Sequence, residues 1–109
     1  MKAQFDVWRF KFPTKGEHPV VLISPTDLCA QSIVNVLYCT SQRQSRTPKP
    51  YEVALNGADG MDWETFCDCS ILWSVPSAAL FDKRGEVTLE RRRAIRAKVR
   101  DLFRLVATD

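Results

Sequence analysis

The chain has 109 residues, a length that accommodates one domain of ordinary size. Hydrophobic residues make up 45% and charged residues 27%, which excludes a largely disordered chain and is typical of a protein with one apolar core. The net charge of +3 permits nucleic-acid binding without indicating it.

The N-terminal segment has no apolar stretch of signal-peptide length, and no later segment approaches the roughly 20 apolar residues that span a bilayer. We therefore expect a cytoplasmic protein without a membrane segment, folded as a single domain over residues 1–109. The Cys67-Asp68-Cys69 spacing is too short for the paired knuckles of structural zinc. We expect free, largely buried thiols and no metal site for the four cysteines, which are Cys29, Cys39, Cys67 and Cys69.

The first half of the chain contains three segments with strand character. Residues 5–12 alternate with period two and are rich in aromatic side chains. A Pro/Gly turn over 13–18 leads to a β-branched run at 19–24, which we expect to be a central, buried strand. After a polar connection that has room for one helical turn, residues 33–40 predict a third apolar strand.

The second half begins with an abrupt change of composition. Residues 41–50 are polar and basic with two prolines, which predicts an exposed loop. Residues 51–55 alternate again as a fourth strand, and the cluster 56–60 turns the chain. Residues 65–75 predict one or two further short strands.

The last part of the chain predicts helical structure. A helical turn is expected at 77–80, followed by a change of direction at Arg84-Gly85. Thr88 is a suitable N-cap, and apolar residues at helical spacing predict a helix over about 88–105. Many short strands and one terminal helix indicate a mainly β (α+β) fold, a small SH3-like antiparallel β-barrel with a C-terminal α-helix.

The order and spacing of several short motifs carry a family resemblance. These are Asp6-Val7-Trp8, the segments 16–24, 34–41, 50–55 and 67–69, and the arginine-rich helix near the C-terminus. Together they resemble the MazF/PemK toxins of type II toxin–antitoxin systems, within the CcdB/PemK superfamily, over residues 5–105. The resemblance implies a homodimeric, metal-independent endoribonuclease without a cofactor. Such a toxin cuts single-stranded RNA, inhibits growth, and is silenced by a cognate antitoxin that occupies the RNA groove.

The chain departs from the family pattern at three positions. His18 stands where the family has its principal catalytic Arg, Phe5 replaces the opening Gly, and Phe66 stands where some members carry an Arg. The threonine that follows the third strand is kept as Thr40, and the acid after Cys67 is kept as Asp68.

Metal-free RNA cleavage requires a base for the 2′-hydroxyl, a proton for the leaving 5′-oxygen and positive charge for the phosphorane. His18 is the only histidine, and imidazoles change charge near neutral pH, so we assign it a catalytic role. Thr40 is the second catalytic candidate, and Ser41 is a candidate RNA contact, because a hydroxyl at a strand end donates well to phosphate. The alternative is an ordinary polar residue at His18 and a turn cap at Thr40. The mechanism requires that both side chains line one cationic groove.

Further candidate RNA contacts are cationic, acidic or aromatic. Basic side chains of the acid-free segment 41–50 suit phosphate neutralisation, although a basic loop is usually only solvated. The Asp68 carboxylate is suited to orient His18 or to accept a hydrogen bond from a base edge. The Trp63 ring is suited to stack on an unpaired base. An arginine-rich face of the C-terminal helix suits RNA or acidic antitoxin residues, or is simply solvated. The basic candidates in segment 41–50 are Arg43, Arg46 and Lys49.

A second function remains open at this point. The missing Arg suggests a catalytically degenerate toxin, or a CcdB-like toxin that binds a protein or nucleic-acid target without cutting RNA. The related gyrase poisons typically end in Trp-Gly-Ile, whereas this chain ends in residues 105–109, LVATD. This ending disfavours the CcdB-like mode.

Overall fold

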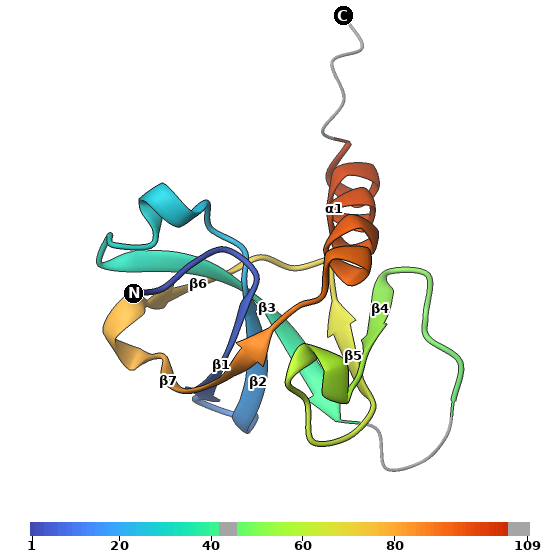
Figure 1. Ribbon diagram of the computed structural model, residues 1–109, viewed down its shortest axis with the longest axis horizontal. Coiled ribbons are helices and arrows are strands. Elements are labelled where there is room, and N and C mark those ends of the chain that lie inside the picture. The colour runs from blue at the N-terminus through green and yellow to red at the C-terminus, as the bar shows by residue number, and fades with distance from the viewer. Residues whose placement is uncertain (42–45, 105–109) are drawn as a thin grey trace, which may run out of the picture.

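The computed structural model describes residues 1–41 and 46–104, which form a curved antiparallel sheet with one C-terminal helix (Figure 1). The order of the paired strands is β4-β5-β3-β2-β1-β7, and β6 pairs with β3. The strands are β1 (Asp6–Phe12), β2 (Gly16–Leu22), β3 (Ile33–Ser41), β4 (Glu52–Leu55), β5 (Thr65–Asp68), β6 (Trp73–Pro76) and β7 (Phe81–Glu86). The helices are the short η1 (Thr26–Leu28), η2 (Gly57–Asp59) and η3 (Ser77–Ala79), and α1 (Leu89–Phe103).

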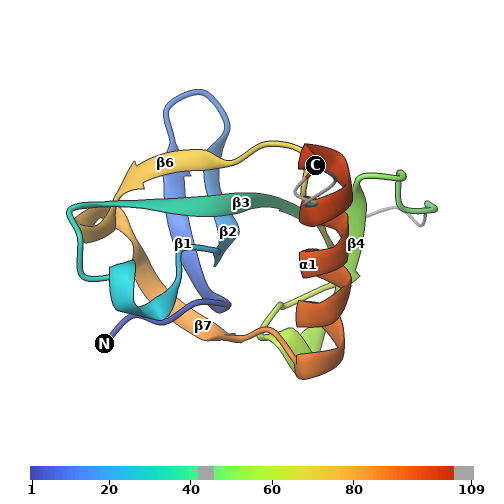
Figure 2. The same ribbon diagram turned by 90° about the horizontal axis from the view of Figure 1, so that it is seen from above.

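The predicted mainly β fold with a C-terminal helix is confirmed, but the sheet is not a closed barrel. Among the described residues, no pairing joins the terminal strands β4 and β7. The strand β3 is long enough to take two partners along one edge: β6 at Ile33 to Val36 and β5 at Cys39 to Ser41. In Figure 2, α1 lies beside β4 at one end of the molecule.

One strand boundary and one whole strand differ from the sequence prediction. The second strand begins at Gly16 rather than at residue 19, because Gly16 adopts a φ of +79° and lets the turn close directly onto β1. The seventh strand was missed, since β7 has the sequence FDKRGE without apolar alternation. It is an exposed terminal strand, so its partner β1 and not its own side chains define it.

The core forms on both faces of the central strands. Val21 and Leu37 pack in one cluster with Val7, while Val20 and Val36 pack in the other. Neighbouring residues of a strand therefore enter different clusters, as the two-residue period requires. The four cysteines are buried and unbridged, as expected.

The start of α1 is attached to η2 through a buried acid. Thr88 is the N-cap, as predicted, but its side chain makes no capping hydrogen bond. Its backbone N–H instead donates to Asp59 Oδ1 at 2.9 Å, and Asp59 Oδ2 accepts from the backbone of Asn56 at 3.0 Å. One carboxylate thus joins η2 to the helix.

In the described part of the chain, no helix has the length and apolar character needed to cross a bilayer.

Candidate functional site

His18 lies in the first part of β2, next to the turn that joins it to β1. Its Nε2 is 2.8 Å from the backbone oxygen of Lys15. Its ring contacts Tyr38 at a centroid distance of 4.9 Å and Phe12 at 6.3 Å, in both cases edge to face. The imidazole is therefore half-buried on an aromatic surface and held by the turn.

Thr40 lies on the same face of β3 as Tyr38, because the two residues are two positions apart in one strand. Val20 pairs with Tyr38, so His18, two residues before Val20, also faces this side. The structure therefore places the candidate catalytic residues on one face, with the Tyr38 ring beside the imidazole. That they act together remains a prediction.

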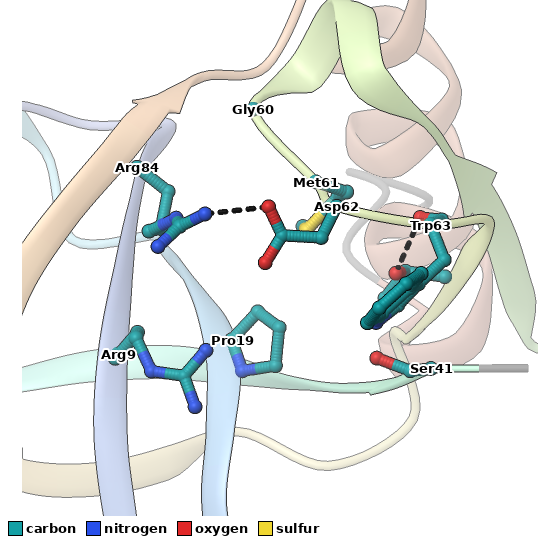
Figure 3. A pocket seen from close by; sticks show the side chains of 9 residues that line it. Arg9, Pro19, Ser41, Gly60, Met61, Asp62, Trp63 and Arg84 are labelled. Carbon is teal, nitrogen blue, oxygen red and sulfur yellow. Dashed lines mark hydrogen bonds and ion pairs between the residues drawn. The ribbon is translucent and has the colours of Figure 1, made fainter.

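A small hollow lies on the opposite face of these strands (Figure 3). It has a volume of about 30 Å³, enough for about one water molecule. Figure 3 shows the Arg84–Asp62 ion pair at one end and the Trp63 indole at the other. The lining residues are Arg9, Pro19, Ser41, Gly60, Met61, Asp62, Trp63, Thr65 and Arg84.

Two of the predicted RNA contacts, Ser41 and Trp63, meet in this hollow. The Trp63 side chain is 65% exposed, which leaves its ring accessible to a partner. The hollow does not include His18 or Thr40, although Pro19 and Ser41 directly follow them in sequence. The predicted site residues therefore divide between two faces of the sheet.

The predicted basic loop is only partly a free cationic arm. Arg46 donates to both carboxylate oxygens of Glu52, at 2.8 and 3.0 Å, and stacks over Phe66 at 4.4 Å. This hydrogen bond lowers the pKa of the buried Glu52 carboxyl below its ordinary value. Lys49 lies over the Tyr51 ring at 5.9 Å and is exposed. Arg43 falls outside the described residues.

Asp68 is engaged locally. Its Oδ1 accepts from the backbone N–H and the hydroxyl of Ser70, at 2.8 and 2.6 Å. The atom that fixes the orientation of His18 is the Lys15 carbonyl oxygen and not this carboxylate. A contact of Asp68 with a base edge remains a prediction.

The arginine-rich helix face is used in part for packing. Arg91 donates to the backbone oxygen of Ala54, and Arg92 donates from Nε to that of Val87 at 2.7 Å. Arg92 and Arg96 also cover the Phe5 ring. These contacts account for three of the basic side chains on the helix without a ligand.

Sequence reasoning overlooked two residues beside His18. Lys15 was taken only as part of a turn, and Tyr38 only as part of an apolar strand. The alternation of β3 was a usable signal for Tyr38, since it shares a face with Thr40. The proximity of Lys15 depends on the tight turn at Gly16 and was not visible in the sequence.

Comparison with known proteins identifies the family. No curated protein matches the chain by sequence. The fold is similar to that of an endoribonuclease in complex with its cognate antitoxin from Mycobacterial species, with a TM-score of 0.81, 19% identity and coverage of 97% of this chain and 98% of that one. A MazF toxin from Mycobacterium tuberculosis gives a TM-score of 0.77 at 14% identity, covering 91% and 96% of the two chains.

A chain from a MazE-MazF structure of Deinococcus radiodurans gives a TM-score of 0.72 at 15% identity, covering 96% of this chain and 98% of that one. These similarities establish the fold. The family itself is established by a family model for the PemK-like, MazF-like toxins of type II toxin-antitoxin systems, which matches residues 3–103. The chain belongs to this toxin family.

Proposed function

We propose that this toxin is a metal-independent endoribonuclease that cuts single-stranded RNA and inhibits growth. Family membership supports the toxin role, and structural neighbours from Mycobacterial species are described as endoribonucleases. The observation that carries the proposal is the His18 imidazole, half-buried on the same sheet face as the Thr40 hydroxyl.

In the proposed reaction, His18 removes the proton of the 2′-hydroxyl. The 2′-oxygen then bonds to phosphorus, the bond from phosphorus to the 5′-oxygen breaks, and that oxygen takes a proton from water. The imidazolium returns its proton to the resulting hydroxide. Thr40 donates a hydrogen bond to a phosphoryl oxygen. The products are a cyclic phosphate and a free 5′-hydroxyl.

The proposed RNA contacts are of unequal quality. Trp63 offers an exposed ring for a base, and Ser41 lines the same hollow. Lys49 offers an exposed ammonium, and Asp68 an acceptor. Arg46 contributes less than an unpaired arginine, because Glu52 compensates its charge. Arg43 is retained as a proposed phosphate contact on its sequence position alone.

The remaining proposals concern partners and location. We propose a homodimer that is neutralised by a cognate antitoxin, because structural neighbours include a toxin with its cognate antitoxin and MazE-MazF complexes. We also propose that residues 1–109 act as one domain in the cytoplasm.

The test is to incubate untagged protein with single-stranded RNA and a chelator and to map the ends of the products. Wild type should leave a cyclic phosphate and a 5′-hydroxyl. His18→Gln should lower the rate by about 10² to 10⁴ if it removes a general base. Gln31→Ala, at an exposed position, is the control and should cut normally.

Two outcomes would contradict different parts of the proposal. Normal cleavage by His18→Gln would show that the imidazole is not the base. Intact RNA with wild type, together with growth arrest on expression, would favour a toxin that binds its target without cutting.

A further inference from the structure

The contact between His18 and the β1–β2 turn determines which ring nitrogen carries a proton. The partner of Nε2 is the Lys15 carbonyl oxygen, at 2.8 Å. A carbonyl oxygen has no hydrogen and only accepts, so Nε2 must be the donor. In the neutral imidazole, Nδ1 is then the basic atom. No hydrogen bond to Nδ1 is formed by the described residues.

The side chain of Lys15 lies over Tyr38, whose ring also contacts His18. Its Nζ lies 5.2 Å from the centroid of the Tyr38 ring, and that ring is 4.9 Å from the imidazole. Phe12 holds the Tyr38 ring in turn, edge to face at 5.2 Å. The Lys15 ammonium is therefore positioned on an aromatic ring that also contacts His18.

Lys15 differs from three arginines of the sheet and its loops in having no ion-pair partner among the described residues. Arg9 pairs with Glu17 at 3.7 Å, and Arg46 pairs with Glu52 at 2.8 Å. Arg84 pairs with Asp62 and Asp82. Within residues 1–41 and 46–104, no ion pair involves Lys15. Among the described residues its positive charge therefore has no acidic partner, and it lies over the Tyr38 ring that contacts the imidazole.

We propose that Lys15 is a further catalytic residue, whose ammonium stabilises the negative charge of the phosphorane while its carbonyl oxygen holds His18 with Nδ1 facing the 2′-hydroxyl. This proposal rests on the proposed RNA cleavage. It supplies the positive charge that the reaction requires and that the paired arginines provide poorly. Nδ1 of His18 is then the single atom that accepts the proton of the 2′-hydroxyl.

The first experiment measures the tautomer directly and needs no RNA. His18 is the only histidine, so a two-bond ¹H–¹⁵N spectrum of untagged protein above neutral pH contains one imidazole to assign. The pattern of a ring protonated at Nε2 is expected. A ring protonated at Nδ1 would overturn the assignment of the basic atom, whatever the activity of the protein.

The second experiment distinguishes an effect of the Lys15 charge from an effect of the net charge of the protein. Lys15→Met should lower kcat by about 10² or more, as expected for the loss of a group that stabilises the transition state, with a smaller change in KM. Lys15→Arg should retain most of the rate. Lys11→Met is the matched control, because Lys11 is exposed and lies opposite Glu17 in the strand register, on the other face of the same two strands.

The outcomes distinguish this inference from the proposed function. If wild type cuts RNA and Lys15→Met cuts equally fast, the role of Lys15 is wrong while the ribonuclease assignment stands. An equal loss of kcat in Lys11→Met would also overturn it, because the effect would then be one of net charge. If wild type does not cut RNA, the proposed function and the catalytic role of Lys15 fail together.

Discussion

Replacement of Gly60 by alanine should destabilise the protein severely. Gly60 has a φ of +88°, and an alanine in this region costs about 1–2 kcal/mol. A Cβ there would lie 2.7 Å from the Arg84 backbone oxygen and 2.9 Å from its carbonyl carbon. Backbone atoms cannot rotate away, so β7 must shift, which adds about 1–3 kcal/mol.

The sum is a loss of about 2–5 kcal/mol in the free energy of unfolding, which for a chain of this size lowers Tm by about 8–20 °C. Thermal unfolding followed by circular dichroism measures it. Gly57→Ala is the control: its added Cβ meets nothing within 4 Å and its φ is not positive. The control should be unchanged or up to about 1 kcal/mol more stable. A Gly60→Ala Tm within about 3 °C of wild type would refute this reasoning.

Three further predictions concern the core and its charges. Phe5→Gly relieves a φ of +71° but removes a buried ring, and the lost packing, about 3–5 kcal/mol, exceeds the relief of about 1–2 kcal/mol. Urea unfolding should therefore show a net loss of about 2 kcal/mol, and a gain in stability would contradict it. Because the folded pKa of Glu52 lies below its unfolded value, its contribution is present at neutral pH and is lost as pH falls through the acidic range. Glu52→Gln should lower stability at pH 7 and flatten the acid dependence of unfolding, and an unchanged acid slope would exclude this role. Hydrogen bonding among the thiols and burial raise the pKa of Cys67 and Cys69, so neither should react with iodoacetamide at pH 8 until the protein unfolds.

Sequence patterns predicted most elements because burial makes them periodic. The runs at 19–24 and 33–40 are apolar because their residues enter core clusters on both faces of the sheet. The strand β7 had no such signal, since most of its residues are exposed. Its position depends on pairing with β1 and on the contact of Gly85 with Gly60. That contact joins residues far apart in sequence, which local patterns do not record.

The candidate site was harder to predict than the fold. The sequence hypothesis that His18 and Thr40 line one cationic groove stays a prediction, although the strand pairing places both residues on one face of the sheet. The pairing of Arg46 with Glu52 was missed, since a basic loop gives no sign of which cation folds back onto a buried acid. The contact with the Lys15 carbonyl was missed as well. The partner of His18 is a backbone atom, which every residue type has, so the sequence gives no signal for it.

The division of the candidates between two faces bears on the form of the RNA. His18 and Thr40 share the face of Tyr38, whereas Ser41 lines the opposite hollow with Trp63. An RNA that contacts the imidazole and the indole together must run from one face of the sheet to the other, and so must bend sharply. A double helix is too stiff for such a bend, but an unpaired strand with splayed bases is not. If both faces bind one RNA molecule, the preference for single-stranded RNA follows from the way neighbouring side chains of β2 and β3 point to opposite faces of the sheet. Such a preference requires no recognition of base identity.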